Sequence, residues 1–177
     1  MVFGSFSLHH LSAQNLSFEL KVSPSVNMVF NTIEKYQNGL IQHNFSQLNI
    51  DADVTWDLYV GAITSTVNEW DEEQRYSNSG ETPDISILQL QFRNANNTSQ
   101  VSGFFPIQDY NNPIYIIGSS ALDPSTACGA VGSNSAGDYL TTPGCFQFNL
   151  DMLIKPGLTY RPGLYKVEIV FTIMENL

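Results

Sequence analysis

Hydrophobic and polar residues alternate along several short stretches of this chain. Near its start, residues 15–23 place Leu16, Phe18, Leu20 and Val22 on one face and polar side chains on the other. Successive side chains of a strand point to opposite faces, so this alternation is typical of a strand with one buried face. The pattern therefore predicts a half-buried β-strand that ends at the proline after it.

The same reasoning predicts further strands. Residues 54–63 are the best candidate for a central strand, because their apolar residues alternate through Trp56, and a tryptophan in mid-strand often fills a sandwich core. Residues 85–93 predict a strand with a bulge, since the apolar pattern slips phase within it. The other candidate strands are residues 27–31, 45–52, 113–117, 146–154 and 164–177.

About eight short strands with no sustained helical period predict an all-β fold, arranged as an antiparallel two-sheet sandwich of the immunoglobulin-like or pilin-like kind. No internal repeat or linker divides the chain, and 177 residues suit one domain. We expect residues 15–177 to form this single domain. Residues 118–144 are its longest irregular region, and a loop of that length is usually functional or cross-linked.

The first fourteen residues, MVFGSFSLHHLSAQ, contain no charged side chain and end in small residues. The distal part of a bacterial secretory signal has such a composition, although the positively charged start of a signal is missing. We therefore expect residues 1–14 to be part of a signal peptide, with an ordinary N-terminal arm as the alternative. Export predicts a secreted or cell-surface protein. No stretch approaches the ~18 apolar residues of a membrane span.

The chain is acidic, with a net charge of −10 and only seven basic residues, which are scattered singly. Nucleic acid is therefore a poor candidate partner, because its recognition needs a basic stripe or patch. The two cysteines, Cys128 and Cys145, lie in a segment rich in glycine, serine and threonine. In an exported protein such a pair predicts a disulfide that closes a loop. Closing it should contribute on the order of 3 kcal/mol.

Catalytic motifs are missing from the sequence, so we expect no enzyme, no cofactor and no metal site. His43 is the one histidine of residues 15–177, and its polar neighbours predict a surface position. Asp51 and Asp53 would point to the same side of a strand and could share a calcium ion. Solvated charges that discourage aggregation of a sheet edge are the favoured interpretation of this pair.

Aromatic residues in polar loops predict a second kind of function. Such rings stack on the apolar faces of sugars, while carboxylates bind sugar hydroxyl groups. Tyr110 also falls in a loop of this kind. The candidate ligand-binding residues are Trp70, Asp71, Glu72, Tyr76 and Tyr139. The favoured alternative is that Trp70 packs over the end of the sandwich.

The C-terminal segment carries a family resemblance. Residues 161–165 (RPGLY) form a Pro-Gly turn with a following tyrosine, and residues 166–173 continue as an alternating strand. This segment resembles the closing strand of secreted bacterial pilin-like and spore-coat-U-like β-sandwich domains. Residues 56–60 (WDLYV) also resemble a core strand of such domains. The chain departs from the pattern at its end, where residues 174–177 contain no aromatic side chain.

The resemblance implies a non-enzymatic structural or adhesive surface module, such as a subunit of an extracellular filament or coat. Its partner would then be the protein itself, through strand exchange or edge pairing. Residues 16–22 suit a donated strand, and they equally suit the first strand of a self-complete domain. The alternative function is a lectin-like module that binds surface glycans through the loop residues named above.

Overall fold

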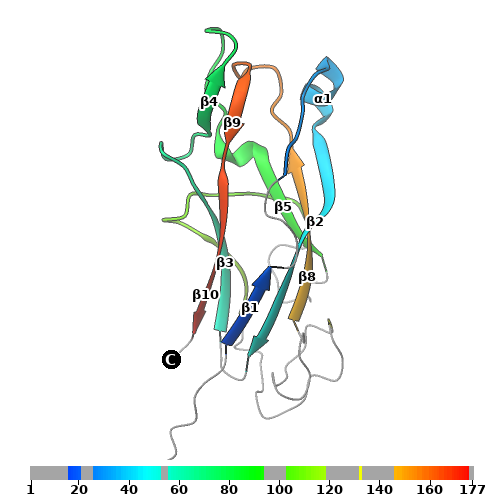
Figure 1. The fold of residues 1–177 in the computed structure, drawn as a ribbon, viewed down its shortest axis with the longest axis vertical. Coiled ribbons are helices and arrows are strands. Elements are labelled where there is room, and N and C mark those ends of the chain that lie inside the picture. The colour runs from blue at the N-terminus through cyan, green and yellow to red at the C-terminus, as the bar shows by residue number, and fades with distance from the viewer. Residues whose placement is uncertain are drawn as a thin grey trace, which may run out of the picture.

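The computed structural model describes residues 16–20, 26–52, 56–93, 103–118, 132 and 146–175. Within them the chain forms an elongated molecule of ten strands and one short helix (Figure 1). The elements are β1 (Leu16–Leu20), α1 (Ile33–Asn38), β2 (Leu40–Ala52), β3 (Trp56–Ile63), β4 (Asp71–Arg75), a 3₁₀ turn (Ile85–Ile87), β5 (Leu88–Arg93), β6 (Phe105–Pro106), β7 (Ile114–Gly118), β8 (Phe146–Ile154), β9 (Gly163–Lys166) and β10 (Glu168–Glu175).

The strands form antiparallel sheets, which confirms the predicted all-β fold. One sheet has five strands in the order β1-β2-β8-β5-β6, and a second has three in the order β10-β3-β7. A two-stranded ribbon, β4-β9, extends beyond them. The sequence predicted about eight strands. It missed β4, whose residues are polar, and the two-residue β6, and it predicted β9 and β10 as one strand.

The five-stranded and three-stranded sheets share one hydrophobic core. Trp56 and Leu58 of β3 are completely buried, as their alternation predicts. The Trp56 ring meets Phe146 of β8 edge to face, with ring centroids 5.1 Å apart. Phe92 of β5 likewise meets Phe171 of β10 at 6.1 Å. Fully burying one such side chain contributes about 1.5–3 kcal/mol, so these contacts hold the two sheets together.

Residues 27–31 are not the short strand that the sequence predicted. Val26, Met28 and Phe30 pack against the core, while the residues between them are exposed. The alternation therefore reflects side chains that enter the core from an extended segment without strand pairing. Helix α1 follows directly and was also not predicted. Its N-cap, Thr32, accepts a hydrogen bond from the backbone N–H of Lys35.

Two further predicted strands are interrupted. Residues 85–93 begin with a 3₁₀ turn instead of a bulge, and Asp84 caps that turn by accepting from the Ser86 N–H at 2.8 Å. The turn explains the slip in phase before β5. The predicted strand 164–177 is divided into β9 and β10 at Val167.

The long axis of the molecule has two distinct ends (Figure 1). Helix α1 and the β4-β9 ribbon lie at one end, which we call the head. Strand β1 begins and β10 ends at the opposite end, which we call the tail. Strand β1 pairs with β2 of its own chain, from Leu16 opposite Ala52 to Leu20 opposite Leu48.

Candidate functional site

Trp70, the predicted centre of a glycan site, is directed inward. Its side chain is half-buried and packs against the core. Its indole Nε1–H donates to the backbone oxygen of Asp84 at 3.1 Å, and its backbone N–H donates to Pro83. Both polar groups are thus used within the chain, which favours the packing interpretation of this residue.

The two acidic neighbours of Trp70 are also engaged in internal contacts. Asp71 accepts a hydrogen bond from the Ser65 N–H at 2.7 Å. The two carboxylate oxygens of Glu72 lie 2.6 Å from Arg75 Nε and 3.3 Å from Arg161 Nε. The hydrogen bond from Arg75 lowers the pKa of Glu72. The contact between Glu72 and Arg161 joins β4 to the segment before β9, so this carboxylate stabilises the ribbon.

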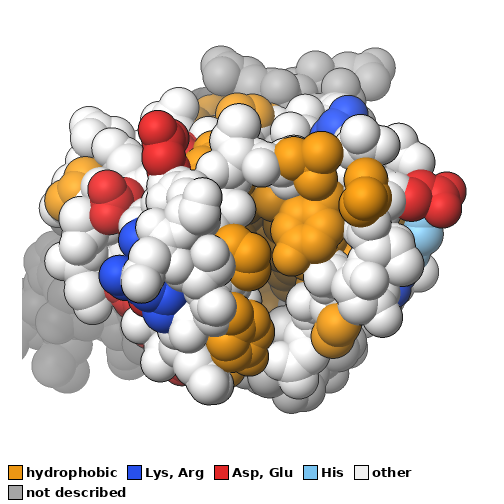
Figure 2. Space-filling view, turned by 90° about the horizontal axis from the view of Figure 1, so that it is seen from above, with side chains coloured by type: hydrophobic (Ala, Val, Ile, Leu, Met, Phe, Trp, Pro, Cys, Tyr) orange, Lys and Arg blue, Asp and Glu red, His pale blue; other side chains and the backbone are white. Residues whose placement is uncertain are grey.

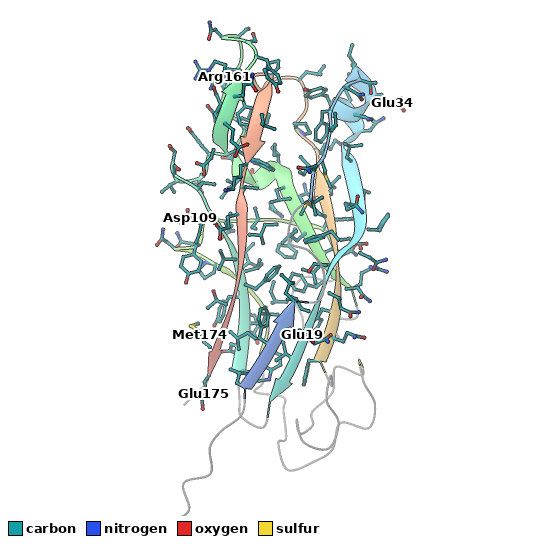
Figure 3. All side chains as sticks on the ribbon, viewed as in Figure 1. Glu19, Glu34, Asp109, Arg161, Met174 and Glu175 are labelled. Atoms are coloured by element: carbon teal, nitrogen blue, oxygen red, sulfur yellow. The ribbon has the colours of Figure 1, made fainter. Side chains whose placement is uncertain are left out.

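The two other described aromatic candidates, Tyr76 and Tyr110, lie on different parts of the fold. Tyr76 is 64% exposed and follows β4 at the head, whereas Tyr110 hydrogen-bonds through its backbone to Ala62 of β3. Figure 3 places Asp109, the neighbour of Tyr110, midway along the molecule. The positions of Tyr139, Asp53 and the two cysteines, Cys128 and Cys145, lie outside the described residues. The disulfide stays a prediction.

A buried carboxylate, which the sequence analysis missed, lies in the five-stranded sheet. The side chain of Asp151 in β8 is only 3% exposed. Its two oxygens accept hydrogen bonds from His43 Nδ1 at 2.8 Å, from the Asn44 N–H at 2.8 Å and from Arg93 Nε at 3.2 Å. Arg93 Nη2 also donates to the Asn44 side chain. Strands β2, β5 and β8 therefore meet at this carboxylate.

The surroundings of Asp151 explain both its ionisation and its role. Burial raises the pKa of a carboxylate, but here the Asn44 N–H, the His43 ring and the charge of Arg93 outweigh it and lower the pKa of Asp151. Asn44 has a φ of 51°, and the β2–β8 register shifts between Gln42 and Ser46. Asp151 thus holds an irregular backbone in place.

His43 is a surface residue, as predicted, with 67% of its side chain exposed. Among the described residues, no hydroxyl group hydrogen-bonds to its ring. The one nearby serine on β2, Ser46, is 2% exposed, and its hydroxyl has no hydrogen-bond partner. An activated nucleophile needs such a bond to a base. The hydrogen bonds of His43 and Asp151 suit a structural clamp between β2 and β8.

Metal-binding clusters and membrane-spanning helices are both absent from the described residues. No three His, Cys, Asp or Glu side chains in this part of the chain are grouped so that they could hold a metal ion. None of its helices has the length and apolar character needed to cross a bilayer.

At the tail, apolar side chains remain exposed on two edge strands. Leu16 and Phe18 of β1 are 37% and 42% exposed, and Met174 of β10 is 47% exposed. Leu16 and Phe18 lie on the face of β1 that also carries Leu20, which packs against the core, whereas Met174 lies on the face of β10 opposite to Phe171 and Ile173, which pack against the core. Within the described part of the chain, no strand pairs with the outer edge of β1 or of β10.

At the head, a hollow opens between α1 and the connection from β8 to β9. Its volume is about 360 Å³, and Figure 2 shows apolar side chains around it. The backbone N–H of Gly157 donates to the Tyr36 oxygen at 2.9 Å, which joins the two walls. We call this hollow the head groove. Its lining is uncharged and consists of Phe30, Asn31, Thr32, Ile33, Tyr36, Leu158, Tyr160 and Pro162.

The rim of the head groove is also apolar. Ile33 and Leu158 are 68% and 60% exposed, and Val29 close by in sequence is 63% exposed. Ile33 and Leu158 both line the groove, and exposed apolar side chains that gather in one place can mark sites of protein contact. The head therefore carries a second candidate contact surface, which sequence reasoning missed.

Comparisons with known proteins leave the family open. No protein-family model matches the chain, and no curated protein matches it at a significant level. The resemblance to pilin-like and spore-coat-U-like domains therefore stays a prediction.

Proposed function

We propose that this protein is a non-enzymatic structural subunit of a secreted or cell-surface assembly, in which copies of the chain contact one another. The observation that carries the proposal is the uncovered edge of β10. This strand pairs with β3 along all eight of its residues, and in the described chain nothing pairs with its other edge.

The core-facing side chains of β10 indicate that this edge is incomplete. Ile169, Phe171 and Ile173 are only half-buried, whereas Trp56 and Leu58 of the neighbouring strand β3 are completely buried. Soluble proteins usually protect an edge strand with lysine, proline or a bulge. The sequence of β10, EIVFTIME, has neither lysine nor proline. A neighbouring copy that covers this edge would complete the burial.

The pairing of β1 bears on how the copies meet. Because β1 already pairs with β2 of its own chain, the described fold favours covering of an edge over donation of this strand. The lectin-like alternative gains no support from Trp70 or Glu72, since both side chains are used in internal contacts.

The proposal is tested on the purified full chain by light scattering after size exclusion, over a dilution series, and by electron microscopy. The wild type is expected to form multimers. The double variant Val170→Lys/Thr172→Lys places two charges on β10 and is expected to elute as a monomer. Ile41→Lys is the matched control, because Ile41 is 49% exposed on β2, and it should behave as wild type.

Circular dichroism melting shows whether each variant is folded. A wild type that stays monomeric at every concentration contradicts the proposed function. Multimers that persist unchanged in the folded double variant show that β10 is not the edge in contact.

A further inference from the structure

We propose that the contact between copies extends from the β10 edge across the outer face of the three-stranded sheet, where tyrosines gather. The inference rests on the proposed function and adds which surface of the fold the second copy contacts. We call this surface the tyrosine face. Its uncharged side chains are those of Tyr59 and Ile63 on β3, Tyr115 on β7, Val170, Thr172 and Met174 on β10, and Tyr110 between β6 and β7.

The tyrosine face continues directly from the strand that carries the proposed contact. The side chains of β10 that pack against the core alternate with Val170 and Thr172, which therefore point outward. Thr172 pairs with Tyr59 of β3, and Tyr59 pairs in turn with Tyr115 of β7. The two tyrosine rings meet edge to face, with centroids 5.5 Å apart. The β10 edge and the tyrosine pair are thus parts of one surface.

A close approach of two backbone segments places Tyr110 on the same face. Its N–H donates to the Ala62 oxygen at 2.8 Å. A Cβ atom at Gly61 would lie 2.8 Å from the Tyr110 Cα, so the chain crosses β3 where a side chain is missing. Buried Asp109 accepts from the backbone N–H and the side-chain amide of Asn111. The segment is therefore fixed, while the Tyr110 side chain stays 41% exposed.

The outer faces of the two sheets differ in chemistry. Figure 1 shows β10 and β3 on one side of the molecule and β2 and β8 on the other. Across β2 and β8, Gln47 donates to Asn149 at 3.0 Å and Gln147 donates to Asn49 at 3.2 Å. Polar side chains of this kind are usual on the solvent face of an antiparallel sheet. The tyrosine face departs from that pattern, which is expected of a surface that a second copy covers.

The size of the contact also argues for this extension. Strand β10 has eight residues, so its edge measures roughly 26 Å by 5 Å. A stable protein contact covers about 800 Å² on each partner, which is several times the area of that edge. A neighbour that touched the edge alone would make too small a contact. The tyrosine face is the uncharged surface that continues from it.

The charged residues of this surface lie at its two ends. Lys166 and Glu168 lie where β10 begins, while Glu175 ends the strand and Asp57 pairs with its neighbour Met174. Contacts between proteins commonly have an apolar centre enriched in tyrosine and a polar rim. The tyrosine face has this arrangement, with its tyrosines between the charged ends.

The first experiment compares two variants of the full chain. The face variant is Ile63→Lys/Tyr110→Lys, whose two original side chains are 43% and 41% exposed. Tyr76→Lys is the matched control, because Tyr76 is a more exposed tyrosine that follows β4 at the head. Light scattering over a dilution series is the measurement, after circular dichroism has shown that each variant is folded.

We expect the face variant to need at least about a tenfold higher concentration than the wild type to assemble by half, because two charges would be buried in the contact. Tyr76→Lys is expected to assemble as the wild type does.

A second measurement needs no substitution. Wild-type protein is treated with the nitrating reagent tetranitromethane at a concentration where it is assembled and at one where dilution has dissociated it. Mass spectrometry then gives the rate at which each tyrosine is modified. We expect Tyr110 to react several times more slowly in the assembled state, and Tyr76 to react equally in both states.

The outcomes separate this inference from the proposed function. A wild type that stays monomeric at every concentration contradicts the proposed function itself. If the wild type assembles but Tyr110 reacts equally in both states, the second copy does not cover the tyrosine face and this inference alone is overturned. A folded face variant that assembles as the wild type does overturns it as well.

Discussion

Asp151 carries its charge in a buried position, and three donors make this favourable. The carboxylate is 3% exposed, and His43, Asn44 and Arg93 all donate to it. Removing one member of such a set leaves the others unsatisfied, which costs more than the bond itself contributes. A single side chain thus fixes the irregular part of β2 against β8.

The lowered pKa of Asp151 gives a pH dependence with a definite sign. A carboxylate with a lower pKa in the folded than in the unfolded state stabilises the fold above its ordinary pKa of about 3.9. That stabilisation is lost as the pH falls through the folded value. We expect Asp151→Asn to lower the free energy of unfolding by roughly 1–3 kcal/mol at neutral pH, and to remove this part of the acid dependence.

Urea unfolding of wild type and variant, at neutral pH and below about pH 3, measures both effects. Glu73→Gln is the matched control, because Glu73 is exposed on β4, and it should keep the wild-type pH dependence. An equal loss of stability from Asp151→Asn at both pH values would contradict the role assigned to the ionised carboxylate.

Among the elements, α1 depends on a glycine for its connection to β2. Gly39 has a φ of 81°, and a Cβ atom there would lie 2.8 Å from the backbone oxygen of Ile154. Any residue with a side chain is therefore strained twice, by the backbone conformation and by the contact. The turn brings α1 against the end of β8, where the head groove is formed.

We expect Gly39→Ala to lower the free energy of unfolding by more than about 1 kcal/mol. Gly103→Ala is the control, since a Cβ atom at Gly103 meets nothing within 4 Å and its φ is not positive. It should stay within about 0.5 kcal/mol of wild type. Chemical denaturation measures the free energy of unfolding of both variants. Equal free energies for Gly39→Ala and Gly103→Ala would show that the backbone adjusts at Gly39 without loss of stability.

The alternation of apolar and polar residues predicted those strands whose apolar side chains face the core and whose backbone pairs with a neighbouring strand. Strand β8 matches residues 146–154, and β3 lies within residues 54–63. Alternation did not predict α1 or the 3₁₀ turn, because local capping bonds from Thr32 and Asp84 decide them. It also predicted a strand at residues 27–31, which is wrong. Side chains there alternate between the core and the solvent, although the segment is not a strand.

The candidate surfaces were harder to predict than the strands, for a physical reason. The sequence shows that Leu16 and Phe18 share an apolar face, but only the structure shows that both side chains are exposed. Asp151 falls on the polar face of its strand by alternation. It is buried because His43 and Arg93, from the two adjacent strands, come together over it.

For the whole molecule, the proposed association of copies couples folding to concentration. Contact between folded copies stabilises the folded state by mass action, so the melting temperature rises with protein concentration. We expect this rise for the wild type and no rise for the double variant Val170→Lys/Thr172→Lys, which places two charges on β10. Differential scanning calorimetry at several concentrations measures it, and a constant melting temperature for the wild type would argue against association of folded copies.

The two glutamates that bound β10 have a consequence for aggregation. If two β10 strands paired antiparallel in full register, Glu168 of each would face Glu175 of the other, at both ends of the ribbon. Like charges directly opposite one another destabilise a strand pair. An edge rich in valine, isoleucine and phenylalanine is otherwise a template for amyloid growth. These two carboxylates therefore disfavour direct pairing of two β10 edges, so the neighbouring copy of the proposed assembly would cover β10 with a different part of its surface.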